Sequence, residues 1–213
     1  EPIKLSKWIS EHCKIDKSDD FMKLKGLMEQ GSKCRRISER GDFLALTGLE
    51  EVLTYRKEKM GTYDNGIPKI KPFTCYVFNQ LKHPDEAKIL RWIYGSSFYL
   101  VGVYSPISER EETLASRIEN TSELVRSECL EKARKLIDFD YSEISEDKFG
   151  QSIQKTFPLA DVFFNERDKE LSKSIDRFVE TIFSNPFHTP TKDEQGMLLA
   201  RNAALRSADL ARQ

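Results

Sequence analysis

One segment of the chain has the glycine spacing of a phosphate-binding loop. Residues 26–33 (GLMEQGSK) match the pattern G-x-x-x-x-G. A working loop continues with Lys and then Ser or Thr, and it lies between a strand and a helix. Here Ser32 precedes Lys33, and the segment falls at the end of a predicted helix. We therefore interpret it as a helix terminus followed by a turn.

Two groups of arginines are candidates for contact with a nucleotide. Lys33, Arg35, Arg36 and Arg40 follow a predicted glycine turn. A guanidinium group can hold phosphate through two hydrogen bonds, so we take Arg35 and Arg36 as candidate nucleotide-binding residues. The alternative is a solvated charged face, which is what runs of charge usually form.

The second group is Arg110 and Arg117, seven residues apart on one predicted helix face after a buried strand. In phosphate-transfer proteins such arginines often belong to a mobile lid, so both are further candidate nucleotide-binding residues. The alternative is a pair of surface ion pairs with Glu111 or Glu112.

The sequence offers no pattern for a metal centre or a covalent nucleophile. The histidines His12, His83 and His188 are far apart and lack ligand spacing. No GxSxG motif occurs, nor an HxE motif followed by PCxxC. The cysteines contain no CxxC pair and are predicted to be reduced thiols: Cys13, Cys34, Cys75 and Cys129. We predict no catalytic residue and no metal ligand in this chain.

Composition narrows the class of protein. The 213 residues include 34 Lys and Arg against 35 Asp and Glu, so the net charge of −1 predicts no general affinity for nucleic acid or anionic membranes. No apolar run approaches the roughly 20 residues that span a bilayer, and the first residues lack the features of a signal peptide. We expect the protein to be cytoplasmic. Because the chain starts at Glu1, we also expect it to be a piece of a longer protein.

The elements that would position the arginines form an α/β pattern. A short strand running into a helix is predicted at 2–9, and helices at 18–30, ending at Gly31, and at 42–59. A strand at 73–80, a helix from Pro84 to Gly95 and a strand at 98–104 form a βαβ unit with a right-handed crossover. The last strand, FYLVGVY, is almost continuously apolar. This pattern predicts burial on both faces, as in a parallel sheet.

The second half of the chain alternates in the same way. Ser108 and Glu111 fit a capping box for a helix, and Thr191 and Glu194 fit another. Between them we predict helices at 121–137, 150–156 and 168–184, a loop at 139–148 and a strand at 162–164. Two prolines within residues 185–191 predict a linker, and the alanine-rich helix after it is expected to run to about Leu210.

Three stretches together resemble one family, the bacterial anti-phage deoxycytidine-nucleotide deaminases. They are LKHPDEAKILRWIYGSSFYLVGVYSP (81–106), GQSIQKTFPLADVFFN (150–165) and PTKDEQGMLLARNAALRSADLARQ (190–213). The first resembles the family's central signature, the second the end of its N-terminal domain, and the third the first helix of its deaminase domain. The likeness is weakest in residues 1–70.

The resemblance implies an α/β fold in two parts. Residues 1–184 would form a P-loop nucleotide-kinase-like parallel sheet flanked by helices. After the linker 185–191, residues 192–213 would be the first helix of an α/β cytidine/deoxycytidylate deaminase domain. Gln151, Asp161, Arg206 and Arg212 match family motifs as structural or domain-junction positions.

The resemblance also implies an activity for the parent protein. It would be a zinc-dependent hydrolase that converts dCTP or dCMP to dUTP or dUMP and so depletes the dCTP pool during phage infection. The zinc ligands and catalytic residues would lie outside this chain, and the 213 residues alone are predicted to be inactive. Implied partners are deoxycytidine nucleotides, a nucleotide in the kinase-like domain, further copies of the chain and a regulatory RNA.

One expectation about the sheet follows from the same resemblance. The phosphate-binding loop and the strand before it would precede Glu1. Because that strand is central in kinase-like sheets, a sheet without it has two facing edges with unpaired backbone groups.

Two alternative functions remain open from the sequence. The domain could be a working nucleotide kinase, or a non-enzymatic module for RNA binding or oligomerisation with residues 33–40 as its contact.

Overall fold

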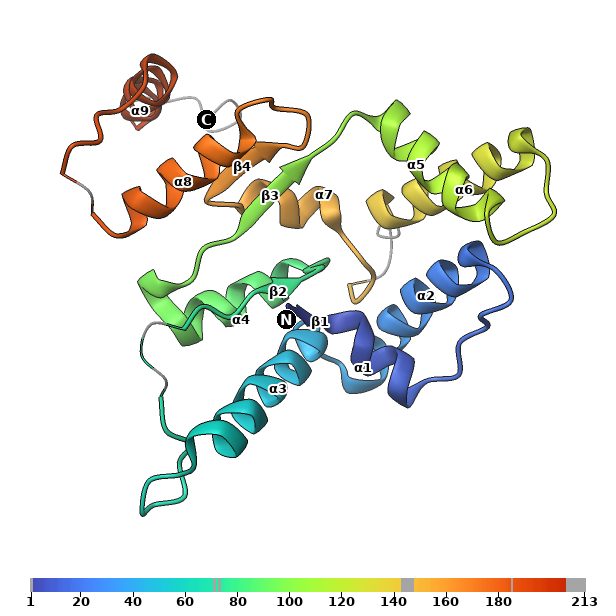
Figure 1. Cartoon of the computed structure of the whole chain (residues 1–213), viewed down its shortest axis with the longest axis horizontal. Helices are drawn as coiled ribbons and strands as arrows, with labels where there is room; N and C mark the ends of the chain where they lie inside the picture. Colours follow the sequence, from blue (N-terminus) through green and yellow to red (C-terminus); the bar gives the residue numbers. More distant parts are fainter. Residues whose placement is uncertain (1, 71, 73, 143–147, 185, 206–213) are drawn as a thin grey trace. The chain divides into compact units, whose positions relative to one another are not determined.

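The computed structural model covers residues 1–213 and describes all of them except 1, 71, 73, 143–147, 185 and 206–213 (Figure 1). The chain divides into two compact units, Glu1–Glu166 and Arg167–Gln213, each described by itself below. Within the described residues, no helix is long and apolar enough to cross a membrane.

The first unit is mainly helical, and its described residues contain four short strands. In chain order its elements are β1 (Ile3–Lys4), α1 (Leu5–His12), α2 (Asp20–Ser38), α3 (Phe43–Met60), β2 (Phe78–Asn79), α4 (Pro84–Tyr94), the 3-10 turn η1 (Gly95–Ser97), β3 (Val101–Tyr104), α5 (Ile107–Glu119), α6 (Arg126–Ser142), α7 (Ile153–Thr156), the 3-10 turn η2 (Phe157–Leu159) and β4 (Val162–Asn165). The predicted α/β class is confirmed at this level.

The strands form two separate parallel pairs. β1 pairs with β2, with Ile3 opposite Phe78, and β3 pairs with β4, with Val101 opposite Val162. The expected βαβ unit is therefore only partly present: β2, α4 and β3 follow one another, but β2 and β3 belong to different sheets. The strand predicted at 73–80 is also shorter, being paired only at Phe78 and Asn79.

The prediction that the strand at 98–104 is buried on both faces is wrong for the described residues. Leu100 and Gly102 are buried, but Val101 is 43% and Val103 is 62% exposed, and Tyr104 is exposed as well. The physical reason is that β3 has a partner strand on one edge only and that little packs over one of its faces.

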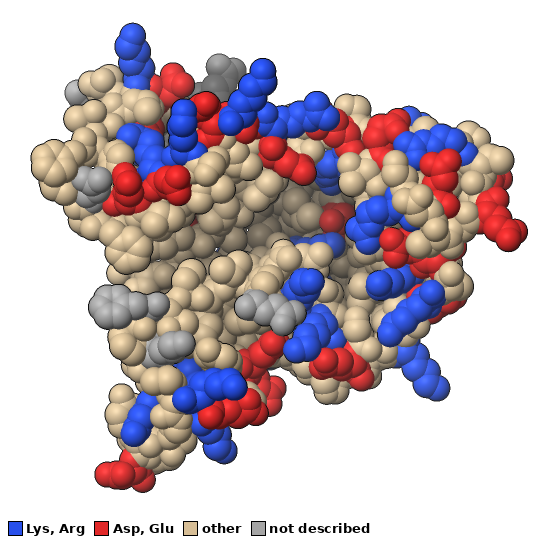
Figure 2. Space-filling model, in the orientation of Figure 1, with Lys and Arg blue, Asp and Glu red and all other residues tan. Residues whose placement is uncertain are grey.

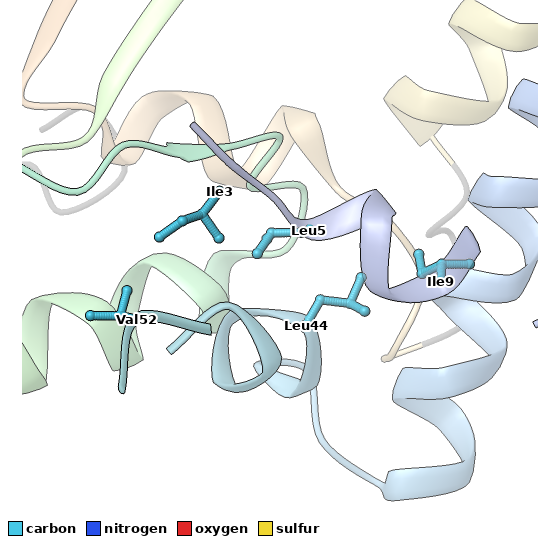
Figure 3. Packing of buried hydrophobic residues seen from close by; sticks show 5 residues of the cluster. All are labelled: Ile3, Leu5, Ile9, Leu44 and Val52. Carbon is cyan, nitrogen blue, oxygen red and sulfur yellow. The ribbon is translucent and has the colours of Figure 1, made fainter. Parts of the chain in front are cut away.

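Two apolar clusters stabilise the first unit. One is shown in Figure 3, where side chains from β1, α1 and α3 converge: Ile3, Leu5, Ile9, Leu44 and Val52. The other joins α5 to α6 through residues that are almost fully buried: Ala115, Ile118, Cys129, Ala133 and Leu136. Helix α2 supplies Phe21, Leu24 and Met28 to the second cluster, and their spacing of three and four residues places them on one face of the helix.

Helix α2 is longer than predicted. It begins after Asp19, whose side chain accepts a hydrogen bond from the Met22 N–H, and it continues through Gly31 to Ser38. Gly31 is buried at a close packing point, because a Cβ there would lie 3.3 Å from Ile9 Cδ1. The glycine therefore serves a helix contact, and the expected turn after it does not exist.

Two further boundaries differ from the prediction. Helix α5 starts after Pro106 with no side-chain cap, so Ser108 lies inside the helix and forms no capping box with Glu111. Helix α6 starts only at Arg126, and it extends to Ser142 through part of the region predicted to be a loop. The rest of that loop, 143–147, lies outside the described residues.

The described residues of the second unit form the helices α8 (Leu171–Ile182) and α9 (Lys192–Ala204). The predicted capping box of Thr191 and Glu194 is confirmed at the start of α9. Arg177 of α8 donates to the Thr189 carbonyl and pairs with Glu194. These contacts join α8 to α9 within the second unit.

Candidate functional site

Each of the two sheets in the first unit has only two strands among the described residues, so both of its edges lack a partner strand, among them the edges of β2 and β3. The carbonyls of Leu100 and Tyr104 accept hydrogen bonds from β4 and its flanks. Since alternate residues of a parallel strand point to opposite edges, Val101 and Val103 direct their N–H and C=O groups to the other edge. By the same rule Phe78 points away from β1, because Val77 accepts from the Ile3 N–H.

The two edges lie across a hollow. In Figure 1, β2 and β3 are the inner strands of the two pairs, and β1 and β4 are the outer ones. Figure 2 shows the surface hollowed between these strands. In parallel sheets ligands bind at the carboxyl ends of strands, where neighbouring connections diverge. The segments that leave β2 and β3 are therefore the candidate site.

The segment that leaves β2 is held rigidly by hydrogen bonds. His83 begins α4 with a capping box: its ring Nδ1 accepts from the Asp85 N–H, while Glu86 Oε2 accepts from the N–H groups of Lys82 and His83. Because Nδ1 is an acceptor, the proton is on Nε2, which donates to the Lys148 carbonyl at 3.1 Å. His83 is therefore the N-cap residue of α4.

A buried ion pair fixes the same turn to helix α2. Arg35 is 1% exposed and Glu86 is 0% exposed. Arg35 Nε and Nη2 donate to Glu86 Oε1 at 3.2 and 2.9 Å. Both carboxylate oxygens of Glu86 are therefore engaged, one by α2 and the other by the backbone. In the sequence H-P-D-E, the spacing of Glu86 from the N-cap residue is that of a capping box, although His83 stands where Ser or Thr is usual.

The structure separates the four basic residues predicted near Gly31. Arg35 points inward to Glu86, whereas Lys33 and Arg36 are exposed on the last turns of α2. Arg40 pairs with Asp42 at 2.8 Å. Arg35 and Arg36 therefore do not share a surface, and any contact made by this region with a phosphate would have to use the exposed members.

The other two arginines lie on α5, which follows β3. Arg110 is half-buried in the second turn of α5, close in sequence to the carboxyl end of β3. Arg117 pairs with Asp20 of α2 at 3.3 Å, so it joins two helices. The alternative partners Glu111 and Glu112 pair instead with Arg134 and Arg126 of α6. The nucleotide-binding role of Arg110 and Arg117 stays a prediction.

No family model, no curated protein and no solved structure matches this chain. Its function is therefore argued from the residues and their geometry.

Asp161 and Gln151, two positions singled out in the sequence by the resemblance, hold elements together. Asp161 accepts two hydrogen bonds from Arg91 Nη2, both at 2.8 Å, and one from the Leu100 N–H at 2.7 Å. These bonds tie α4 and the start of β3 to β4. Gln151 donates to the Met28 carbonyl of α2 at 3.1 Å. Arg206 and Arg212 lie outside the described residues.

Sequence patterns did not indicate the ion pair of Lys82 with Asp140, 58 residues apart, at 2.6 Å. It joins the β2–α4 turn to α6. The Ser152 N–H also donates to the Lys82 carbonyl at 2.8 Å. With the contacts of His83 and Glu86, these bonds attach the turn to α2, to α6 and to the start of α7, so its conformation is strongly determined.

Among the described residues, the side chains around the β2–α4 turn are held by hydrogen bonds and ion pairs. Residues 26–33, with the spacing of a phosphate-binding loop, lie inside the continuous helix α2 and form no loop; the helix terminus and turn predicted there are not present. Across the described part of the chain, no three His, Cys, Asp or Glu side chains gather as a metal-binding group. The charged groups around the β2–α4 turn are paired with one another. The described residues therefore fix the conformation of the β2–α4 turn, at the carboxyl end of a parallel strand.

Proposed function

We propose that this chain is the nucleotide-kinase-like scaffold or regulatory part of an anti-phage deaminase that converts deoxycytidine nucleotides to deoxyuridine nucleotides. The proposal depends on the three stretches that resemble that family. Two of them, 81–106 and 150–165, supply the β2–α4 turn, β3 and β4, which are the elements that surround the hollow.

The observation that most supports the proposal is that two of the free sheet edges, those of β2 and β3, border the same hollow. A nucleotide-kinase-like sheet is parallel, is flanked by helices and has a central strand followed by the phosphate-binding loop. The described chain has two parallel pairs whose inner strands, β2 and β3, lack a partner on the sides bordering the hollow. One further parallel strand between them would satisfy the backbone groups of Phe78, Val101 and Val103.

Zinc chemistry would have to come from residues other than those described. The described chain gathers no set of zinc ligands. In the proposal, the catalytic zinc therefore belongs to a deaminase domain that follows α9, and no step of the reaction is assigned to this chain.

The deciding experiment is an activity assay on the full-length protein. We expect bound zinc by metal analysis and the release of ammonia from dCTP or dCMP, with the matching uridine nucleotide as product. A protein with neither zinc nor turnover, even in the presence of phage-infected cell extract, would contradict the proposal.

Nucleotide binding by the kinase-like part is a separate expectation. Loss of a charge-assisted hydrogen bond from Arg110 to phosphate should weaken dCTP binding roughly 10- to 100-fold. Arg110→Ala is therefore compared with Arg134→Ala, which removes an exposed arginine of α6, by titration calorimetry. Equal affinities of the two variants would remove Arg110 from the site.

The alternatives can be tested in the same preparation. Transfer of phosphate from ATP to a deoxynucleoside monophosphate would indicate a kinase. To test whether residues 33–40 are the contact of an RNA-binding or oligomerisation module, the double variant Lys33→Glu with Arg36→Glu should be used. Arg35→Glu is unsuitable, because it would place a second carboxylate beside the buried Glu86.

A further inference from the structure

Two cysteines that are 21 positions apart in the sequence meet in the first unit. Cys13 directly follows α1, and Cys34 lies in the last turns of α2. Their sulfur atoms are 3.9 Å apart. Both side chains are half-buried, whereas Cys75 is exposed and Cys129 is buried in the cluster between α5 and α6.

The surroundings allow this pair to react. The two thiols border an open hollow of about 340 Å³, which His12, Lys14 and Lys33 also line. A small oxidant can therefore reach the sulfur atoms from solvent. The positive side chains around the opening favour the approach of an anionic or polar oxidant.

The geometry requires only a modest movement to join them. A disulfide bond is about 2.0 Å long, so the sulfur atoms, now 3.9 Å apart, must approach by about 1.9 Å. Cys13 can supply this movement, because it lies beyond the end of α1 on extended backbone with φ −119° and ψ 147°. Cys34 is held by the helix that contains it.

We propose that Cys13 and Cys34 form a reversible modification site, at which a peroxide converts the two thiols to an intramolecular disulfide. Disulfides of this kind in reducing compartments are transient and serve redox sensing. The proposal concerns residues away from the β2–α4 turn and does not depend on the deaminase assignment.

The order of the two steps follows from the environment of Cys34. Burial, and next the neighbouring Cys13 thiol, raises the pKa of Cys34 to about 11, although Arg35 and Lys33 act in the opposite direction. The Cys34 thiol therefore stays protonated, and the first attack is assigned to Cys13. The Cys13 thiolate attacks one peroxide oxygen, the O–O bond breaks, and hydroxide leaves with the proton that Cys13 gave up, as water.

In the second step the sulfur of Cys34 attacks the sulfenic acid of Cys13. The S–S bond forms, the S–O bond breaks, and the hydroxyl group leaves with the Cys34 proton as a second water. In total two thiols lose two electrons and one peroxide gains them. The product is a ring from Cys13 to Cys34 that fastens α1 to α2 one residue before Arg35.

The experiment treats the full-length protein with hydrogen peroxide, quenches it with catalase and alkylates the remaining thiols with iodoacetamide before proteolysis. We expect a peptide pair cross-linked through Cys13 and Cys34, lighter by about 2 Da than its two thiol forms. Dithiothreitol should restore both free peptides. Cys75→Ser is the matched control and should give the same cross-link.

The two single-cysteine variants distinguish a reaction between Cys13 and Cys34 from unspecific oxidation of the cysteines. In Cys34→Ser, the sulfenic acid of Cys13 should persist and be trapped by dimedone, whereas in Cys13→Ser dimedone labelling of Cys34 should be at least tenfold lower. The proposal is overturned if oxidised wild-type protein gives Cys13 and Cys34 both alkylated, or if the cross-link joins either of them to Cys75 or to a second chain.

Discussion

The buried pair of Arg35 and Glu86 gives the sharpest test of the structure. Arg35→Met keeps most of the side-chain volume but leaves the Glu86 carboxylate buried with no cationic partner. Removing one member of a buried ion pair costs about 3–5 kcal/mol, because the remaining charge is uncompensated. At about 2–4 °C per kcal/mol for a chain of this size, we expect the melting temperature to fall by roughly 6–20 °C.

The geometry also predicts a rescue. Glu86 accepts hydrogen bonds from the N–H groups of Lys82 and His83 through Oε2, while Arg35 uses Oε1. Glu86→Gln keeps an oxygen for the two N–H groups and removes the charge. The double variant Arg35→Met with Glu86→Gln should therefore be more stable than Arg35→Met alone. Arg35 Nη1, which is buried and has no hydrogen-bond partner among the described residues, is removed as well.

The assay is urea unfolding followed by far-ultraviolet circular dichroism, with the slope of the transition compared among variants. Arg134→Met is the surface control: its pair with Glu111 has side chains 60% and 19% exposed, and such pairs contribute at most about 1 kcal/mol. If Arg35→Met costs no more than Arg134→Met, or if Glu86→Gln adds to its effect, the pair is not buried as described and the reasoning fails.

Three further predictions concern other parts of the chain. Gly48→Ala should destabilise the protein by about 1–3 kcal/mol in urea unfolding, because a Cβ there would lie 2.8 Å from Leu5 Cδ2. Gly196→Ala, where a Cβ would meet nothing within 4 Å, should instead stabilise α9 by up to about 1 kcal/mol, which a rise in helix content would show. Thr191→Ala should cost about 1 kcal/mol and speed amide exchange in the first turn of α9 only. The hydrogen bond from the Thr191 N–H, and then Arg177, hold the pKa of Glu194 below its ordinary value of 4.5. The ionised carboxylate therefore stabilises the helix above about pH 4.5, and this stabilisation is lost as the pH falls through the lower pKa of the folded state. Glu194→Gln should remove this pH dependence in an acid titration followed by nuclear magnetic resonance.

Local signals in the sequence were sufficient for many elements. Pro84 and Gly95 bound α4 where they were expected, and Thr191 with Glu194 forms the predicted capping box. These features are decided by backbone chemistry within a few residues: a missing N–H, a positive φ of 54° at Gly95, and side chains that reach the nearest free N–H groups.

Features decided by distant residues were not predictable in the same way. The role of Gly31 depends on Ile9, which packs against it, and so a residue that often ends helices lies inside one. Arg35 lies in a run of charges, which usually marks a solvated surface. Only the fold brings Glu86 beside it, 51 positions along the chain. The contact between Cys13 and Cys34 likewise depends on how α1 packs on α2.

The strand β3 shows a different relation between pattern and structure. Its sequence is almost continuously apolar, which is typical of a strand that is buried on both faces, yet Val101 and Val103 are substantially exposed in the described chain. The described residues therefore leave part of the apolar surface of β3 uncovered. If a parallel strand joins β2 to β3, hydrogen exchange of the Val101 and Val103 amides should be slow in the full-length protein, because both N–H groups point to that edge. Fast exchange at both amides in the full-length protein would mean that the edge is open to solvent, and the central argument for a kinase-like sheet would be lost.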